Sequence, residues 1–400
     1  MEFSSEIKVR NLTSVILRNT EASDWKEPTA IQMQSIPIML NNRDILAAAP
    51  TGSGKTAAFV LPVLSAVAAR THGGRRGLQA VLLAPTRELS EQIHREAERL
   101  SAGKRLKIGV LKKNVASAAL GKQEKTSFDK YDILVATPMR LVTLIKAEVI
   151  DLSNVKIVVL DEADKLFEMD NADHSAARHA FLNQVDTILA ACSQTSEQLQ
   201  RALFSATITP FVTEIAAGFL RDPITLRIGQ DNAAADTIDQ KLLFVGTEEG
   251  KLLAVRQLFQ VGLKPPALIF LQNKERAKEL FKELIYDGVN VDVMHAERTQ
   301  AQREEIITKF RSGEIWVLIC TDLMARGIDF KGVNMVVNYD LPTSAVSYIH
   351  RIGRTGRAGN RGSAVTFFTE ADMPNVRSIA NVVRLSGCDV PDWMMKIKQL

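Results

Sequence analysis

The strongest chemical signal in the sequence is residues 49–56 (APTGSGKT), which follow the apolar run 45–48 and precede a helix-like run that begins at Ala57. Glycines let a backbone wrap around phosphate oxygens, and the amides at a helix start face an anion. Lys55 would then reach the β- and γ-phosphates of ATP, and the hydroxyl of Thr56 would bind Mg²⁺. A chance loop of the same composition is the alternative. The residues predicted to bind the nucleotide here are Ala49, Thr51, Gly52, Ser53, Gly54, Lys55 and Thr56.

A second chemical signal is the acidic tetrad 161–164 (DEAD), which directly follows the apolar run 157–160. A carboxylate at a strand end can hold Mg²⁺ through its water shell, and a neighbouring carboxylate can activate the attacking water. We assign the first role to Asp161 and the second to Glu162. For such a tetrad alone an acidic helix cap is the alternative. Its combination with the phosphate loop favours a site that hydrolyses ATP.

Short apolar runs that alternate with amphipathic stretches must position these groups. The runs are typical of buried parallel strands, and the stretches between them, such as 88–100 and 139–150, suit helices. Ligands of such sheets bind beyond the carboxyl ends of the strands, where nearly every polar cluster of this chain falls. The sequence thus predicts an α/β fold of parallel sheets flanked by helices. The predicted strands are 45–48, 81–84, 133–136, 157–160 and 202–204, then 267–270, 291–294, 317–320, 335–338 and 364–368.

The length of 400 residues and the two series of apolar runs predict two domains, each with its own core. Between the two series, residues 229–237 are small and polar, as is typical of a linker. We therefore expect one domain at 1–228, a second at 238–385 and a C-terminal tail at 386–400.

The composition restricts the class of protein without identifying it. The 50 basic and 46 acidic residues nearly cancel, so that any basic surface for nucleic acid must be local. The three cysteines follow no metal-ligand spacing, which argues against a zinc site or a disulfide framework. No apolar run approaches the length of a membrane span, so we expect no membrane partner.

Together these motifs resemble the signature of the DEAD-box RNA helicases, and the rest of the chain agrees. Trp25 and Gln32 resemble the adenine-reading segment of that family, in which Gln32 would bond the base edge and Trp25 would stack near it. The tripeptide 205–207 (SAT) resembles the one that couples hydrolysis to strand separation, and 350–357 (HRIGRTGR) resembles the arginine-finger segment. The resemblance implies two tandem RecA-like domains, with the nucleotide and RNA sites at the cleft between them.

The resemblance also implies roles for individual residues near these motifs. Arg354 and Arg357 would neutralise charge on the transferring phosphoryl group, and His350 would link them to the Asp161 loop and to Ser205. Asp329 would hold the ribose hydroxyls. The residues implied in coupling the two domains are Ser205, Thr207, Asp322 and Arg326.

Segments at other strand ends resemble the family's RNA-binding motifs, which grip the sugar–phosphate backbone without reading sequence. Because Thr and Asn are good helix caps, a capped helix start is the alternative at each position. The 2′-hydroxyl would let such a site prefer RNA over DNA. Met139 stands where the family usually has Gly, and residues 107–122 contain no Gly-Gly pair. The implied RNA-binding residues are Thr86, Arg87, Thr137, Arg140, Asn273, Arg303 and Thr321.

Three further stretches, 246–252 (GTEEGKL), 291–299 (VDVMHAERT) and 325–334 (ARGIDFKGVN), look like the eukaryotic nucleolar subfamily that acts on small-subunit pre-ribosomal RNA. That resemblance implies a protein of the nucleus and nucleolus with pre-ribosomal RNA or protein partners, and we expect it to be a monomer. The implied activity couples ATP binding and hydrolysis to interdomain closure and to local, non-processive RNA unwinding or ribonucleoprotein remodelling. Two alternatives stay open: an ATP-gated RNA clamp or assembly scaffold, and a DNA helicase of the same two-domain class.

Overall fold

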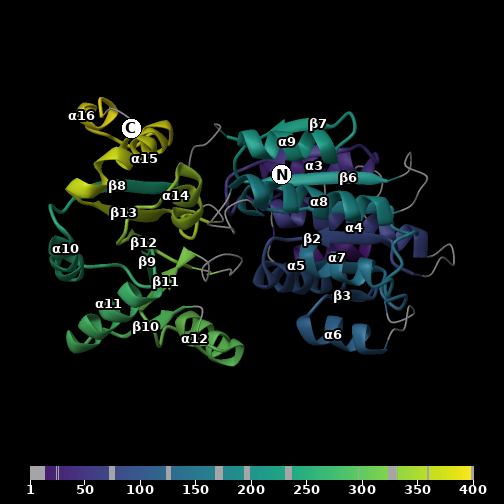
Figure 1. The fold of residues 1–400 in the computed structure, drawn as a ribbon, viewed down its shortest axis with the longest axis horizontal. Coiled ribbons are helices and arrows are strands. Elements are labelled where there is room, and N and C mark those ends of the chain that lie inside the picture. Colours follow the sequence, from purple (N-terminus) through teal and green to yellow (C-terminus); the bar gives the residue numbers. More distant parts are fainter. Residues whose placement is uncertain are drawn as a thin grey trace. The chain divides into compact units, whose positions relative to one another are not determined.

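The chain divides into two compact units in the computed structural model (Figure 1): Met1–Ala49 with Ser53–Ile228, and Gly229–Leu400 with Pro50–Gly52. Each unit is a parallel sheet with helices on both faces, which confirms the predicted α/β class. The described helices include none that is long and apolar enough to cross a membrane. The structure describes residues 14–23, 25, 27–71, 77–122, 128–166, 174–192, 199–229, 237–295, 297–322, 330, 332–357 and 360–397.

In the described part of the first unit, seven parallel strands lie in the order β3-β4-β2-β5-β6-β1-β7. The sequence predicted the five central strands but missed β3 and β7 at the two edges. β3 has only three residues and β7 is only partly buried, so neither forms a long apolar run. The strands are β1 Ile45–Ala48, β2 Ala80–Leu83, β3 Ile108–Val110, β4 Ile133–Ala136, β5 Ile157–Leu160, β6 Gln200–Ser205 and β7 Ile224–Arg227.

Successive side chains along these strands pack alternately into two separate apolar cores. Ile45 and Ala47 of β1 point into one core, while Leu46 belongs to the other. A central strand buried on both faces therefore needs consecutive apolar residues. The first core is covered by α2 Ser14–Glu21, α3 Ala30–Leu40, α4 Lys55–Thr71 and α5 Arg87–Leu100. The second is covered by α6 Lys113–Lys122, α7 Pro138–Lys146, α8 His174–Ala191 and α9 Pro210–Phe219.

The helix predicted over 139–150 is wrong at its C-terminal end, because α7 stops at Lys146. Glu148 has a φ of 55°, in the left-handed region that ends a helix. The amides of Glu148 and Val149 donate back to the carbonyls of Ile145 and Leu144 at 3.0 and 3.2 Å. Val149 is buried in the second core, so the apolar pattern continues although the helix does not.

In the described part of the second unit, six parallel strands lie in the order β10-β11-β9-β12-β13-β8. The sequence missed only the edge strand β8, in which buried and exposed residues alternate. The strands are β8 Ile238–Phe244, β9 Ala267–Leu271, β10 Val291–Met294, β11 Val317–Thr321, β12 Met335–Asn338 and β13 Gly362–Phe368.

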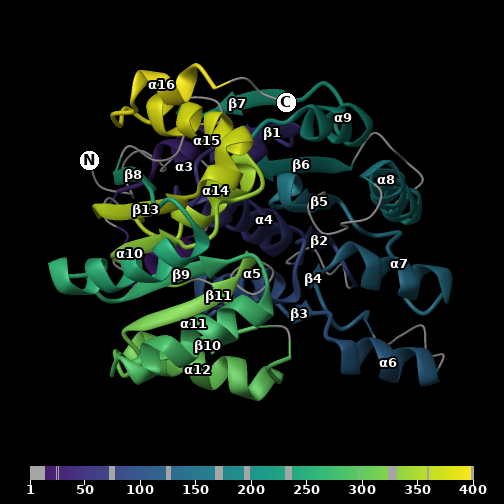
Figure 2. The same cartoon turned by 60° about the vertical axis from the view of Figure 1, so that its left-hand side comes forward.

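Helices cover this second sheet on both faces (Figure 2). One core is closed by α10 Glu248–Val261 and α11 Lys274–Tyr286. The other is closed by α12 Gln300–Ser312, α14 Ala345–Ile352, α15 Met373–Leu385 and α16 Asp392–Met395, whose Met394 is buried. Two short 3-10 helices, η2 Ala163–Leu166 and η4 Glu370–Asp372, complete the described elements.

We predict that Asp44→Asn destabilises the first unit by about 1–3 kcal/mol, because it leaves a buried amide facing a donor. Asp44 is 7% exposed, and its two carboxylate oxygens accept from the amides of Arg201 and Arg221 at 2.8 and 2.9 Å. Native-state hydrogen exchange of the β1 and β6 amides measures the loss. Asp222→Asn is the control, since that side chain is 97% exposed in its ion pair with Arg43 and should cost about 0.5 kcal/mol or less. Equal effects of the two variants would contradict the prediction.

Candidate active site

The phosphate loop joins the end of β1 to the start of α4. Gly52 and Gly54 have φ values of 80° and 94°, a region that is strained for any residue with a side chain. Ser53 Oγ is buried and, among the described residues, has no hydrogen-bond partner. A buried hydroxyl without a partner costs free energy, so its presence in this loop fits a bound oxyanion. The loop therefore has both the backbone and the donor that a nucleotide phosphate needs.

Lys55 and Asp161 bring opposite charges into the interior of the first unit, with exposures of 8% and 3%. Lys55 Nζ donates to the carbonyl of Ala49. Burial lowers the pKa of the Lys55 ammonium, and the carboxylate of Asp161 opposes that shift. Burial and the neighbouring Glu162 raise the pKa of Asp161 to about 7, against the attraction of Lys55. The structure thus brings together a cation suited to phosphate and a carboxylate suited to a metal.

Glu162 is held in an unusual position just after β5. Its φ is 50°, in the left-handed region where a non-glycine residue is strained. Its backbone amide donates to Asp161 Oδ1 at 2.9 Å, and its carboxylate pairs with Lys165 Nζ at 2.6 Å. Lys165 is fully buried. Sequence reasoning missed Lys165, although a lysine three residues after an acid in a helical turn is a recognisable pair.

The acidic segment is also joined to Ser205 and Thr207 at the end of β6. Asp164 Oδ2 accepts from the amide and the hydroxyl of Thr207 at 3.0 and 2.9 Å. Ser205 Oγ donates to the carbonyl of Thr207 at 2.8 Å. The structure therefore joins Thr207 directly to the acidic tetrad, and Ser205 to it through Thr207. Sequence reasoning gave Asp164 no role, because nothing in the spacing connects it to Thr207.

Gln32 lies against the phosphate loop. Its Nε2 donates to the carbonyl of Gly54 at 3.2 Å, and its Oε1 accepts from the amide of Thr29 at 3.0 Å, which closes a capping box on α3. Trp25 packs on the apolar core beneath, with the Arg99 guanidinium 5.0 Å from the centre of its ring. Gln32, one of the two residues assigned to the base, is thus hydrogen-bonded to the phosphate loop.

The RNA-binding candidates of the first unit follow β2 and β4, which are neighbours in the sheet. Thr86 precedes α5, and its Oγ1 accepts from the amide of Leu89 at 3.2 Å. Thr86 therefore caps the helix, as the structural alternative for this position proposed. Thr137 heads α7 without capping it. Arg140 donates to the carbonyl of Leu111 at 3.2 Å. A terminal guanidinium nitrogen of Arg87 lies 3.9 Å from Glu88 Oε1, in a long ion pair. In the sheet order β2 lies directly beside β5, whereas β4 lies one strand farther from the nucleotide loops on β5, β6 and β1.

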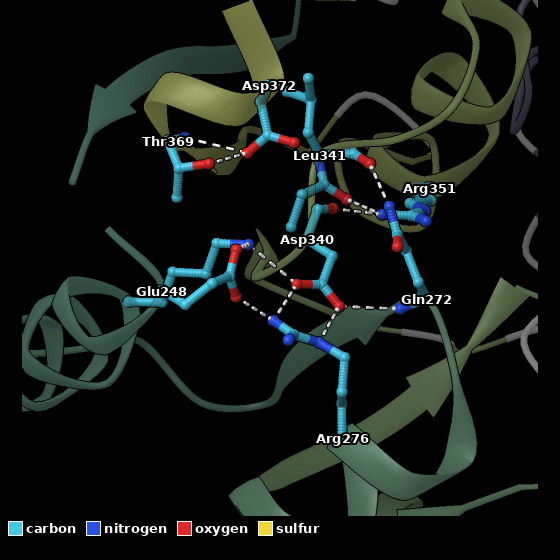
Figure 3. A network of polar contacts seen from close by, with 10 residues as sticks. Glu248, Gln272, Arg276, Asp340, Leu341, Arg351, Thr369 and Asp372 are labelled. Carbon is cyan, nitrogen blue, oxygen red and sulfur yellow. Dashed lines mark hydrogen bonds and ion pairs between the residues drawn. The ribbon is translucent and has the colours of Figure 1, made fainter. Parts of the chain in front are cut away.

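In the second unit, Asn273 and Thr321 lie at the ends of the neighbouring strands β9 and β11. Asn273 caps α11 by accepting from the amide of Arg276 at 3.0 Å. Arg303 lies in the first turn of α12. A cluster of charges around Asp340 at the end of β12 borders the Gln272–Asn273 turn (Figure 3).

The arginine segment begins inside α14. His350 and Arg354 are both 5% exposed, and Arg354 Nε donates to the carbonyl of His350 at 3.3 Å. Arg357 Nε donates to the carbonyl of Gly353 at 2.8 Å. Asp322, a coupling candidate, forms an ion pair with the buried Arg351, whose Nε lies 2.6 Å from Asp322 Oδ1. The sequence did not predict a role for Arg351.

Some candidates cannot be placed, and the metal has no protein cage in the described structure. Asp329 and Arg326 lie outside the described residues. Within the described ranges, no cluster of three or more His, Cys, Asp or Glu side chains could hold a metal ion. Mg²⁺ does not need such a cluster, because it is commonly held by one or two carboxylates, phosphate oxygens and water. Asp161 and the Thr56 hydroxyl, beside the phosphate loop, fit that role.

Two segments of the chain match known families. Residues 29–215 match the DEAD/DEAH box helicase family, and residues 250–359 match the helicase conserved C-terminal domain. A solved structure, Dbp5 of S. cerevisiae bound to RNA and ADP BeF3, is similar with a TM-score of 0.79 and 29% identity over 99% of each chain. This likeness confirms the predicted tandem RecA-like fold.

Curated relatives are similar over almost the whole chain. "Probable ATP-dependent RNA helicase DDX52" of Mus musculus is 51% identical over 97% of this chain, which spans 63% of the length of that protein. "ATP-dependent RNA helicase ROK1" of Scheffersomyces stipitis is 49% identical, with coverage of 97% of this chain and 68% of the relative. Its motifs, its fold and these relatives together show that the chain belongs to the DEAD-box family of RNA helicases.

Proposed function

We propose that this protein is an RNA-stimulated ATPase and helicase, which couples ATP binding and hydrolysis to domain closure and to local unwinding of RNA. The observation that supports this best is the pair of buried charges Lys55 and Asp161, next to the half-buried Glu162 and beside a loop with a buried hydroxyl that has no described partner. Such an arrangement is costly for a folded protein unless a charged ligand enters it. A nucleoside triphosphate with Mg²⁺ has the matching chemistry.

In the first unit each charged residue has a separate task. Lys55 and the loop amides bind the phosphates, while Asp161 and Thr56 hold Mg²⁺, largely through water. When bound, Mg²⁺ neutralises charge on the phosphates. Glu162 orients and activates the water that attacks the γ-phosphate, and its ion pair with Lys165 keeps its carboxylate in place.

The second unit supplies the remaining charge. Arg354 and Arg357 stabilise the transition state as arginine fingers, and His350 and Asp322 help to order the closed form. Hydrolysis then requires closure of the two domains, and RNA that grips both of them favours closure. The bonds between Asp164 and Thr207 provide a direct path from the hydrolytic segment to the Ser205–Thr207 coupling segment.

We expect ATP turnover to rise on addition of RNA but not on addition of DNA of the same sequence. Lys55→Ala removes the phosphate cation and Glu162→Gln removes the base, so each should lower RNA-stimulated turnover by about 100-fold or more. Phosphate release under saturating ATP is the measurement. Glu98→Gln on α5, whose side chain is 57% exposed, is the control and should leave turnover unchanged. Near-normal turnover in either site variant would refute the assignment, and equal stimulation by DNA would favour a DNA helicase.

Arg357→Ala should leave ATP affinity within about twofold while it lowers RNA-stimulated turnover about 1,000-fold, since a finger acts on charge that develops only in the transition state. Equilibrium binding of a fluorescent ATP analogue, measured beside single-turnover hydrolysis, separates the two effects. A parallel loss of affinity and turnover would show that Arg357 contributes to ground-state binding instead.

We further propose that the RNA duplex belongs to small-subunit pre-ribosomal RNA and that the protein acts in the nucleolus with pre-ribosomal partners. The stretches 246–252, 291–299 and 325–334, which resemble the nucleolar subfamily, support this. Crosslinking of bound RNA in cells, followed by sequencing, should recover ribosomal precursor. A signal scattered over messenger RNA would remove this narrower proposal and leave the helicase activity intact.

A further inference from the structure

Asp340 is the centre of a buried charge cluster in the second unit. It follows β12, is 2% exposed, and contacts three different elements (Figure 3). Arg276 of α11 holds both carboxylate oxygens, with its Nε 3.0 Å from Oδ2 and a terminal nitrogen 2.6 Å from Oδ1. Lys251 Nζ of α10 donates to Oδ1 at 3.0 Å. The amide of Gln272 donates to Oδ2 at 3.0 Å.

The cluster is balanced in charge, which explains how a carboxylate can be buried there. Burial alone raises the pKa of Asp340, but Arg276, the Gln272 amide and Lys251 outweigh it and hold the pKa below its usual value. Glu248 accepts from both cations and completes the network. Removal of Arg276 or Lys251 would leave the buried Asp340 with fewer partners, so each single loss should be destabilising.

What the cluster holds is the turn at the end of β9. Asp340 fixes the backbone of Gln272, and the Gln272 side chain donates to the carbonyl of Leu341 at 3.4 Å. The next residue, Asn273, accepts from the amide of Arg276 at 3.0 Å. Arg276 is therefore bonded to the turn through its backbone and to Asp340 through its guanidinium. The position of Asn273 depends on both bonds.

Asp340 is also connected to the arginine segment. The carbonyl of Asp340 accepts from Arg351 of α14 at 2.8 Å, and Arg351 pairs in turn with Asp322, the residue after Thr321. Arg351 stands between His350 and Ile352 and is itself 2% exposed. Asp340 thus joins the Asn273 turn, the Thr321 strand end and the helix that precedes Arg354, all within one unit.

We propose that Arg276 and Asp340 are positioning residues that hold the Asn273 turn in register with the arginine segment, so that RNA bound at this turn promotes hydrolysis. The proposal rests on the proposed function, because it concerns how RNA acts on the same ATPase. Neither residue needs to touch RNA or nucleotide. Their effect passes through the backbone of Gln272 on one side and through Arg351 on the other.

Arg276→Gln tests this in the full chain. It should raise the RNA concentration for half-maximal ATPase stimulation about tenfold and lower turnover at saturating RNA, while the KM for ATP without RNA stays within about twofold. Arg256→Gln is the matched control. Arg256 also bridges α10 and α11, through Asp287 and Glu283, and its side chain is 36% exposed against 31% for Arg276. The control should lose less thermal stability, because Glu283 and Asp287 are more exposed than Asp340, and it should keep the normal RNA response.

Arg276→Lys keeps the charge but cannot hold both carboxylate oxygens, so its RNA response should fall between those of the wild type and Arg276→Gln. This variant also carries the test if Arg276→Gln does not fold. Wild-type half-maximal RNA concentration and saturating turnover in a folded Arg276 variant, with only a lower unfolding temperature, would overturn the proposal. Absence of RNA stimulation in the wild-type protein would instead remove the proposed function on which it rests.

Discussion

The structure depends on the pairing of buried charges at the carboxyl ends of parallel strands. In the first unit Lys55 and Asp161 lie almost wholly inside the protein, as does Lys165 beside Glu162. In the second unit, Asp340 and Arg351 are equally buried. Charges are removed from water only where opposite charges or ligands replace it. Sheets of apolar strands provide the rigid frame that such pairing requires, and they place it at the edge where ligands bind.

Much of this frame follows from sequence because burial on both faces demands unbroken apolar runs. Ten strands that have such runs were predicted, and the three that were missed, β3, β7 and β8, are edge strands with short or alternating patterns. The end of α7 could not be foreseen, since Val149 extends the apolar pattern past a residue in the left-handed region. The periodicity of apolar residues predicts which residues are buried, but it predicts less well where the backbone turns.

The candidate site divides in the same manner. The phosphate loop and the acidic tetrad have local spacing that carries their chemistry, whereas Asp164 and Thr207 meet across 43 positions and Arg276 and Asp340 across 64. No spacing rule connects partners so far apart, because the tertiary fold alone brings them together. Thr86 and Asn273 show a further limit, for each caps a helix and still lies where RNA contact is proposed. A cap and a binding group can be the same residue.

The Asp340 cluster also constrains how the sequence can change over time. Loss of Arg276 alone leaves the buried Asp340 with one fewer partner, and loss of Asp340 alone leaves Arg276 and Lys251 to share the more exposed Glu248. Each single step therefore passes through a less stable intermediate, even when the double change would be tolerated. Residues tied in this way become entrenched by the order in which mutations must occur. Conservation of these residues among related proteins would then reflect the instability of the single-mutant intermediates as much as the function of the contact.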